Sequence, residues 1–247
     1  MREDAALTTP TYREEAVRSA LVDLASPAPL VSFQGVWRHW GRGKNRWPVL
    51  RDVNLDVPAG TAISVAGGNG AGKTTLLRIA TGILSPDSGS VTIDGLTADG
   101  SWREYHRRIG FLSAGDRGLY ARLTVRRHLE YWASLAFMAR EDRKAAVDDA
   151  LARFGLAELA HRRADRLSQG QRQRLRLALT VLHRPQVLFL DEPRNSLDAD
   201  GLEILRTVVG ELLAGGGSVM WCSPMGEEQP MTFDRRLLIE GGELRPA

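Results

Sequence analysis

Residues 67–75 have the sequence Gly67-Gly68-Asn69-Gly70-Ala71-Gly72-Lys73-Thr74-Thr75, which fits the pattern G-x-x-x-x-G-K-[ST]. This stretch follows a predicted strand at residues 61–66 and opens a predicted helix at residues 73–80. Glycines let the backbone wrap closely around a phosphate group, so that peptide N–H groups and the start of the helix face the anion. A glycine-rich turn with an incidental lysine is the alternative, and the strand-to-helix context argues against it. The stretch therefore predicts a loop that binds the phosphate groups of a nucleotide.

Four side chains have predicted chemical roles at this site. Lys73 would place a cation at the β- and γ-phosphates, and the Thr74 hydroxyl would be a ligand of Mg²⁺. A second motif, residues 187–193, is an apolar run that ends in two acids, Asp191 and Glu192. Ligands of parallel sheets gather where the strands end, so we expect Asp191 to hold Mg²⁺ through water and Glu192 to polarise the attacking water as a general base. A strand that merely ends in two acids is the alternative, and the phosphate loop upstream disfavours it.

The rest of the chain predicts an α/β fold in which strands alternate with helices. Such alternation favours a mainly parallel sheet covered by helices on both faces. The expected strands are Val31–Val36, Val53–Val57, Thr61–Ala66, Ser90–Ile93, Val187–Leu190 and Ser218–Cys222. The expected helices are Lys73–Ala80, Thr124 through about Ala139, Glu141–Phe154, Gln169–Leu182 and Ala199–Leu213.

Two segments differ from the rest of the chain in composition. Residues 1–29 end in a Pro-containing linker and predict an extension, partly helical or disordered, before a domain at 30–247. Residues from about 115 to 165 are arginine-rich and helical, and are predicted to form an inserted helical subdomain. No window approaches the roughly 18 uninterrupted apolar residues of a membrane span.

Composition limits the possible classes of protein. The chain has 247 residues, a formal net charge of +3 and a single cysteine, Cys222. One cysteine excludes a disulfide framework and a multi-cysteine metal site, and Cys222 itself is expected to be a buried strand residue and not a catalyst. Of the 33 basic residues only three are lysines. An arginine bias is compatible with nucleic-acid or phosphate binding, or with a GC-rich coding sequence; no nucleic-acid partner is expected, because helical surfaces account for most of the arginines.

A third motif, Leu167-Ser168-Gln169-Gly170-Gln171-Arg172-Gln173-Arg174, lies between the other two. With the phosphate loop before it and Asp191-Glu192 after it, the chain resembles the ATP-binding subunits of ABC transporters from about residue 30 to residue 244. The resemblance implies that LS-x-GQ opens a helix whose N-terminus closes over ATP held by a second such subunit. Ser168, Gly170 and Gln171 would then serve the partner's nucleotide. As the alternative, LSQGQ is only a helix N-cap followed by polar residues.

The resemblance carries further expectations. It implies a P-loop NTPase fold of the RecA type, with a parallel-sheet core, an antiparallel β subdomain and the inserted helical subdomain. Trp40 lies where the family places an aromatic ring that stacks on adenine, and Trp37 and Trp47 compete for that role. Asp198, in the loop after Asp191-Glu192, matches a segment that contacts the other subunit.

Two positions depart from the family's pattern. After residues 109–112 the family usually has a glutamine that touches Mg²⁺ and the attacking water, and here Ala114 stands in its place. After the strand that ends near Cys222 it usually presents a histidine to the γ-phosphate, and here Pro224 replaces it. Such groups are typically worth a few kcal/mol each, so hydrolysis is expected to be slow or conditional. Two alternatives stay open: a heterodimer in which this site is degenerate, or subfamily variation with Asp116 or Ser223 as substitutes.

The resemblance also implies ligands, partners and place. The ligands are ATP and Mg²⁺, and the enzyme class is an ATP hydrolase with possible low intrinsic activity. The partners are a second ATPase subunit and separate transmembrane permease subunits, so the protein would lie peripherally on the cytoplasmic face of the cell membrane. Residues 115–125 and 194–198 look most like the same segments in subunits of two-component exporters of lipids, polysaccharides, drugs or antibiotics. A nucleotide-dependent regulatory subunit, acting as a switch with little turnover, is the alternative function.

Overall fold

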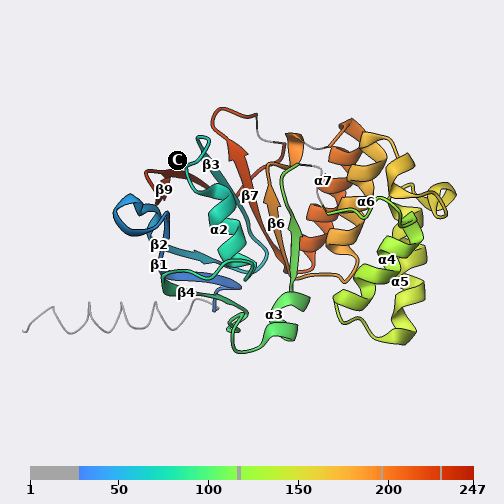
Figure 1. Ribbon diagram of the computed structural model, residues 1–247, viewed down its shortest axis with the longest axis horizontal. Coiled ribbons are helices and arrows are strands. Elements are labelled where there is room, and N and C mark those ends of the chain that lie inside the picture. The colour runs from blue at the N-terminus through green and yellow to red at the C-terminus, as the bar shows by residue number, and fades with distance from the viewer. Residues whose placement is uncertain (1–27, 116–117, 196, 229) are drawn as a thin grey trace, which may run out of the picture.

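The computed structural model describes residues 28–115, 118–195, 197–228 and 230–247, and it contains two β-sheets with helices between and beyond them (Figure 1). Strands β1 (Val31–Trp40), β2 (Trp47–Val57) and β4 (Ser88–Ile93) form an antiparallel sheet in the order β2-β1-β4. The predicted extension lies, over residues 1–27, outside the described part of the chain, as do Asp116 and Ser196.

The second sheet is the centre of the molecule. Its order is β5-β6-β7-β3-β8-β9, and all neighbouring pairs are parallel except β8 and β9. The strands are β3 (Ala62–Gly67), β5 (Ile109–Leu112), β6 (Val187–Asp191), β7 (Ser218–Pro224), β8 (Arg235–Glu240) and β9 (Glu243–Pro246). The predicted parallel core and antiparallel β subdomain are therefore confirmed.

Helices cover both faces of this central sheet, as Figure 1 shows. Helix α2 (Lys73–Ala80) lies between it and the antiparallel sheet, whereas α6 (Gln169–Val181) and α7 (Ala199–Ala214) lie on the other side. Beyond them are α4 (Val125–Leu135) and α5 (Arg140–Arg153), and α3 (Trp102–Arg107) precedes β5. Among the described residues no helix has both the length and the apolar character needed to cross a membrane.

Strand alternation divides the interior into two cores. On β6, Leu188 and Leu190 pack with the helices α4 to α7, whereas Val187 and Phe189 pack with α2 and the antiparallel sheet. Successive side chains of a strand point to opposite faces, so one buried apolar run can supply both cores. The same alternation places Asp191, the next residue, on the α2 side.

The helical subdomain is held by local signals that the sequence carries. Thr124 caps α4 by accepting a hydrogen bond from the Arg127 N–H at 3.2 Å, and Gly155 follows α5 with a left-handed φ of 62°. Inside, the buried His128 receives the Tyr120 N–H at Nε2 and bonds the Thr124 carbonyl through Nδ1, both at 2.9 Å. These contacts fix the entry of the chain into α4.

Several element bounds differ from the prediction. Strands β1 and β2 are longer, because they continue as a hairpin whose ends bring Trp40 opposite Trp47. Helix α4 ends at Leu135 and not near Ala139, since the chain turns at Phe137, whose φ is 55°. Strands β8 and β9 and helix α3 were not predicted, because polar residues interrupt the regular spacing of their apolar residues.

Candidate nucleotide-binding site

The phosphate loop joins β3 to α2 and can close only because it is built of glycine. A Cβ atom at Gly67 would lie 2.7 Å from Ile239 Cγ2, and one at Gly72 would lie 2.8 Å from the Val49 carbonyl oxygen. Gly72 also has a φ of 115°, which side-chain-bearing residues rarely adopt. The loop is therefore pressed against β8 and β2 where it leads into α2.

Lys73 has the position that phosphate binding requires. Its side chain is only 5% exposed, and its Nζ donates to the carbonyl oxygens of Gly67 at 2.8 Å and Gly68 at 3.1 Å. The same ammonium group lies 3.3 Å from Glu192 Oε1. A buried cation on the pocket wall, paired here with an acid, can balance the charge of an anionic ligand.

Thr74 and Asp191 form the second pair of the site. The Thr74 hydroxyl donates to Asp191 Oδ2 at 2.9 Å, and Asp191 is buried. Burial raises the pKa of Asp191, and the bond from Thr74 opposes that rise. Its other oxygen, Oδ1, is buried and accepts no hydrogen bond from the described residues. A hydroxyl beside a carboxylate with an unused oxygen is a donor set that suits Mg²⁺, so the residues fit this ion.

Glu192 is held in a strained backbone conformation. Its φ is 49°, in the left-handed region, and its N–H donates to the Cys222 carbonyl at 3.0 Å. Its Oε2 accepts a bond from Asn195 Nδ2 at 3.1 Å, while Oε1 faces Lys73. Strain of this kind costs about 1–3 kcal/mol and persists at functional sites where the surroundings enforce it.

Two tryptophans share a cavity of about 480 Å³ with the phosphate loop and Glu192. Trp40 and Trp47 are directly opposite in the β1–β2 hairpin, so their side chains lie on the same face. The guanidinium carbon of Arg38 lies 5.2 Å from the centre of the Trp40 ring. Trp37 does not line this cavity and stacks on His39 with ring centroids 6.2 Å apart. Of the three candidates for the adenine contact, the structure therefore brings two to the site.

The two unusual positions also lie at the site. Pro224 is the last residue of β7 and is paired with Gly67, the first residue of the phosphate loop. Ser223 is buried one step earlier, and strand alternation points its side chain away from the face that holds Cys222 and Asp191. The peptide N–H of Ala114 faces the Asp191 carboxyl group and lowers the pKa of that group.

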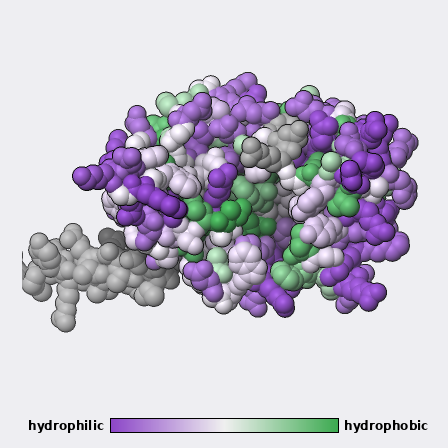
Figure 2. Space-filling model, in the orientation of Figure 1, coloured by the Kyte–Doolittle hydropathy of each residue, from purple (hydrophilic) through white to green (hydrophobic). Residues whose placement is uncertain are grey.

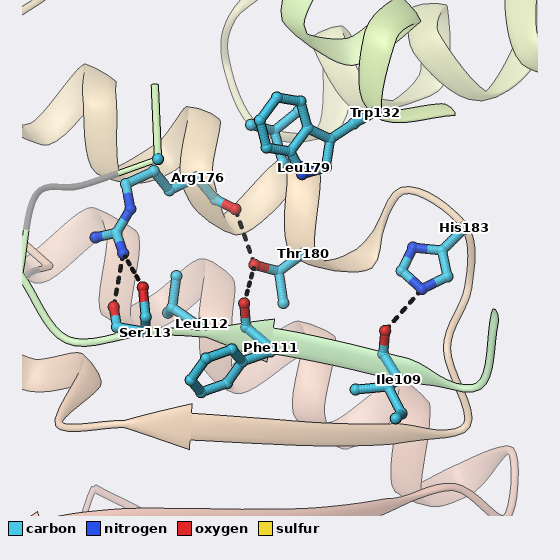
Figure 3. A pocket seen from close by; sticks show the side chains of 10 residues that line it. Ile109, Phe111, Leu112, Ser113, Trp132, Arg176, Leu179, Thr180 and His183 are labelled. Atoms are coloured by element: carbon cyan, nitrogen blue, oxygen red, sulfur yellow. Dashed lines mark hydrogen bonds between the residues drawn. The ribbon is translucent and has the colours of Figure 1, made fainter. Parts of the chain in front are cut away.

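Arg176 is a residue that the sequence did not single out. It lies on α6, is 6% exposed and donates to both neighbours of Ala114. Figure 3 shows its guanidinium group directed at Ser113, beside a cavity of about 300 Å³ that Trp132 and His183 also line. The fold makes this contact between residues that lie about 60 positions apart in the sequence, so no local sequence pattern could have revealed it.

The LS-x-GQ motif lies apart from this cavity. Ser168 and Gln171 form a capping box at the start of α6: Ser168 Oγ accepts the Gln171 N–H at 3.2 Å, and Gln171 Oε1 accepts the Ser168 N–H at 3.0 Å. The interpretation of LSQGQ as a helix N-cap is thus correct as a description of the local structure. Asp198 caps α7, and its Oδ2 would lie 2.1 Å from a Cβ at Gly170. Among the described residues that line the nucleotide cavity, none comes from this group.

Known proteins share both the sequence and the fold. A family model described as ABC transporter matches residues 50–195. The ATP-binding protein NatA of Bacillus subtilis is 34% identical over 195 residues, which cover 79% of each chain. The daunorubicin resistance ATP-binding protein DrrA3 of Streptomyces coeruleorubidus is 32% identical over 214 residues, covering 87% of this chain and 66% of that protein.

Solved structures have the same architecture. A dimeric ATP-binding cassette named MJ0796, in a post-hydrolysis state with ADP and Pi, superposes with a TM-score of 0.76 at 24% identity, covering 87% of this chain and 98% of that one. An ATP-binding subunit of an ABC transporter gives a TM-score of 0.77 at 22% identity, covering 87% and 88%. The matched fold, the phosphate loop and the relatives together establish that the chain belongs to the ABC transporter family, as one of its ATP-binding proteins.

Proposed function

We propose that the chain binds Mg-ATP, dimerises on it and couples ATP hydrolysis to transport by a separate membrane permease. One observation carries this proposal: Lys73, Thr74, Asp191 and Glu192 meet at one end of the central sheet, beside a cavity that Trp40 and the phosphate loop line. The cavity holds an aromatic face for a base, peptide groups for phosphates and a carboxylate for a proton. A nucleoside triphosphate needs all three.

The residues suit hydrolysis of the terminal phosphate. A water oxygen attacks the γ-phosphorus as its bond to the bridging oxygen breaks, and the products are ADP and inorganic phosphate. Glu192 accepts the water proton, Lys73 balances charge on the phosphate oxygens, and bound Mg²⁺ would neutralise the β- and γ-phosphates. Thr74 and Asp191 would hold that ion. The ion pair of Lys73 with Glu192 must loosen as the phosphates enter, because both groups then face the ligand.

A second subunit would complete the site. Ser168, Gly170, Gln171 and Asp198 cluster at the starts of α6 and α7, outside the nucleotide cavity of their own chain. A helix N-terminus attracts anions, so this cluster suits a phosphate group presented by another chain. The likeness to a dimeric cassette supports the same arrangement.

The helical subdomain offers a surface for the permease. Tyr120, Tyr131, Leu135 and Phe137 are exposed large apolar or aromatic residues on or near α4. In Figure 2 most hydrophobic side chains gather at the middle of the face in view, and hydrophilic ones cover most of the end where α4 and α5 lie, so these exposed residues stand among polar surroundings. An apolar surface on an otherwise charged protein suits a protein partner. We propose that the chain associates with the cytoplasmic face of the membrane and serves export, and the relative named a daunorubicin resistance ATP-binding protein supports this direction.

A regulatory subunit with a degenerate site is the second candidate function. Ala114 supplies no side-chain donor or acceptor, and Pro224 supplies neither an N–H nor a titratable group. Slow hydrolysis would make nucleotide occupancy a long-lived state, as a switch requires. In a heterodimer with a competent ATPase, the site of this subunit would also hydrolyse ATP slowly.

The Glu192→Gln variant separates the two functions. The permease is first recovered by pull-down from membranes, and transport and ATPase activity of the complex are then measured together. A motor loses both activities, whereas a switch keeps transport when hydrolysis stops. The matched control is Glu203→Gln, an exposed acid on α7 that does not line the cavity. Failure of the wild-type protein to bind Mg-ATP would contradict both functions.

A further inference from the structure

Arg176 holds the segment in which Ala114 stands. One guanidinium nitrogen donates to the Ser113 carbonyl at 2.6 Å and to the Ser113 hydroxyl at 3.1 Å (Figure 3). The other donates to the Gly115 carbonyl and, at 2.8 Å, to Gln173 Oε1. The carbonyls before and after Ala114 are therefore both bound by one buried arginine. Charged donors give the stronger class of hydrogen bond, and Arg presents them in a fixed planar geometry.

The segment so held lies beside the metal-binding pair. Strand β5 runs parallel to β6, with Leu112 opposite Leu190, so the residues after Leu112 run alongside Asp191. The Ala114 N–H is directed at the Asp191 carboxyl group, which also accepts the Thr74 hydroxyl at 2.9 Å. A continuous series of contacts thus runs from the phosphate loop, through Asp191 and the main chain at Ala114, to Arg176.

The other end of this series is the helix that begins with LS-x-GQ. Arg176 and Gln173 are both buried residues of α6, and the capping box of Ser168 and Gln171 opens the same helix. A helix is stiff along its axis, so a displacement of Ser113 and Gly115 reaches the start of α6 without an intervening loop.

We propose that Arg176 is a positioning residue that fixes the main chain at Ala114 against Asp191 and so ties the metal site to the LS-x-GQ helix. The inference rests on the proposed function, because a link between the metal site and the LS-x-GQ helix has a role only in a protein that binds Mg-ATP. Where the family usually uses a glutamine side chain, this chain uses peptide groups held from behind by an arginine. Ala114 then needs no functional side chain.

Four variants test the role of Arg176. Arg176→Ala removes the clamp, Arg176→Lys keeps the charge but not the forked geometry, and Ser113→Ala removes only the 3.1 Å bond to the hydroxyl. The control is Arg143→Ala, because Arg143 also donates to a carbonyl, that of Met138, and to a serine hydroxyl, that of Ser134, both at 2.9 Å but within the helical subdomain. Circular dichroism verifies that each variant folds.

Two measurements follow, one without nucleotide and one with it. Amide hydrogen exchange at Ala114 in the ligand-free protein reports the clamp directly, and we expect it to be at least about tenfold faster in Arg176→Ala. Calorimetric titration with ATP, with and without Mg²⁺, gives the factor by which the ion improves binding. We expect that factor to fall roughly tenfold in Arg176→Ala, less in Arg176→Lys and Ser113→Ala, and not at all in Arg143→Ala, with metal-free ATP binding unchanged.

The outcomes separate this inference from the proposed function. Exchange at Ala114 equal to wild type in Arg176→Ala, or an unchanged Mg²⁺ factor, would overturn the role of Arg176. Were Arg176→Ala unable to fold, Arg176→Lys and Ser113→Ala would decide the same question. Wild-type protein that does not bind Mg-ATP would overturn the proposed function, while faster exchange in the variant would still support the clamp.

Discussion

Lys73 Nζ lies 3.3 Å from Glu192 Oε1, across the mouth of the phosphate loop. The two residues come from different elements, the start of α2 and the end of β6, and each has further support. Lys73 donates to two loop carbonyls, and Glu192 accepts from Asn195. The cation proposed to bind phosphate and the proposed general base therefore form an ion pair, and an arriving phosphate would compete with Glu192 for the ammonium group.

Replacement of Lys73 by Met should remove most of the affinity for ATP. The methionine side chain keeps the apolar length of lysine but supplies no charge for the β- and γ-phosphates. We expect a loss of at least about a hundredfold, the equivalent of ~2.7 kcal/mol. Lys144→Met is the control, because Lys144 is an exposed residue whose ammonium group pairs with Asp148 on α5. Equal ATP dissociation constants for the two variants, measured by calorimetry, would refute the assignment.

Trp40 and Trp47 should both support binding of the base, whereas Trp37 should not. Stacking of a base on an aromatic ring is worth about 1–3 kcal/mol, so Trp40→Ala and Trp47→Ala should each weaken ATP binding roughly tenfold. Trp37→Ala should bind normally, because its ring lies against His39 and outside the cavity.

Inorganic tripolyphosphate provides a check within this experiment. It offers the same phosphates without a base, so its affinity should be unchanged in all three tryptophan variants. A loss of tripolyphosphate binding in Trp40→Ala would mean that the substitution disturbs the phosphate loop and not the stacking contact.

Pro224→His should increase the hydrolysis rate. Residue 224 is paired with Gly67 at the start of the phosphate loop, so a histidine there could reach the terminal phosphate from β7. It would restore a charged hydrogen-bond donor, which is worth a few kcal/mol when aimed at developing charge. We expect an increase of about tenfold or more in kcat for ATP, with Pro224→Ala as the control for loss of the ring. A rate no higher than that of Pro224→Ala would show that the rest of the site, and not this position, limits turnover.

Much of the site could be predicted because its chemistry is local in sequence. The bounds of α2 and the burial of Lys73 follow from a strand, a glycine loop and a helix in succession, and the position of Asp191 follows from an apolar run that ends in an acid. The contact of Arg176 with Ser113 could not be predicted, since it joins residues 63 positions apart and arginines are abundant in this chain. The choice among three tryptophans was left open for the same reason: only the β1–β2 register puts Trp47 opposite Trp40.

Gly170→Ala should separate nucleotide binding from dimerisation. The added methyl group would meet Asp198, whose carboxylate is already held by the Gly201 N–H at 2.8 Å, so the start of α6 must shift. ATP binding by the monomer should be unchanged, because none of these residues lines the cavity. ATP-dependent dimer formation, measured by light scattering in the Glu192→Gln background, should fall at least about tenfold.

The control for this prediction is Gly210→Ala. Gly210 lies in α7, where a Cβ would meet nothing within 4 Å, and alanine favours a helix by about 1 kcal/mol over glycine. This variant should be as dimeric as the parent and slightly more stable. Dimerisation that is unaffected by Gly170→Ala would contradict the placement of LS-x-GQ at the subunit interface.

His128 should make the helical subdomain sensitive to mild acid. A peptide N–H can only donate and a carbonyl can only accept, so Nε2 accepts from Tyr120 and Nδ1 carries the proton bonded to Thr124. Burial lowers the pKa of His128 below 6.5, although the bond to the Thr124 carbonyl acts in the opposite direction. The folded protein therefore prefers the neutral ring.

The sign of the pH dependence follows from proton binding. Below about pH 6.5 the histidine of the unfolded chain takes up a proton that the folded chain resists, so the free energy of unfolding should fall as the pH is lowered. It should be flat above this range. Burial also lowers the pKa of His183, so that residue contributes with the same sign. His128→Gln, which keeps an acceptor for Tyr120, should reduce the slope between about pH 7 and pH 5 in urea titrations. The exposed His161→Gln should leave it unchanged. If His128→Gln keeps the wild-type slope, protonation of His128 does not govern acid stability in this range.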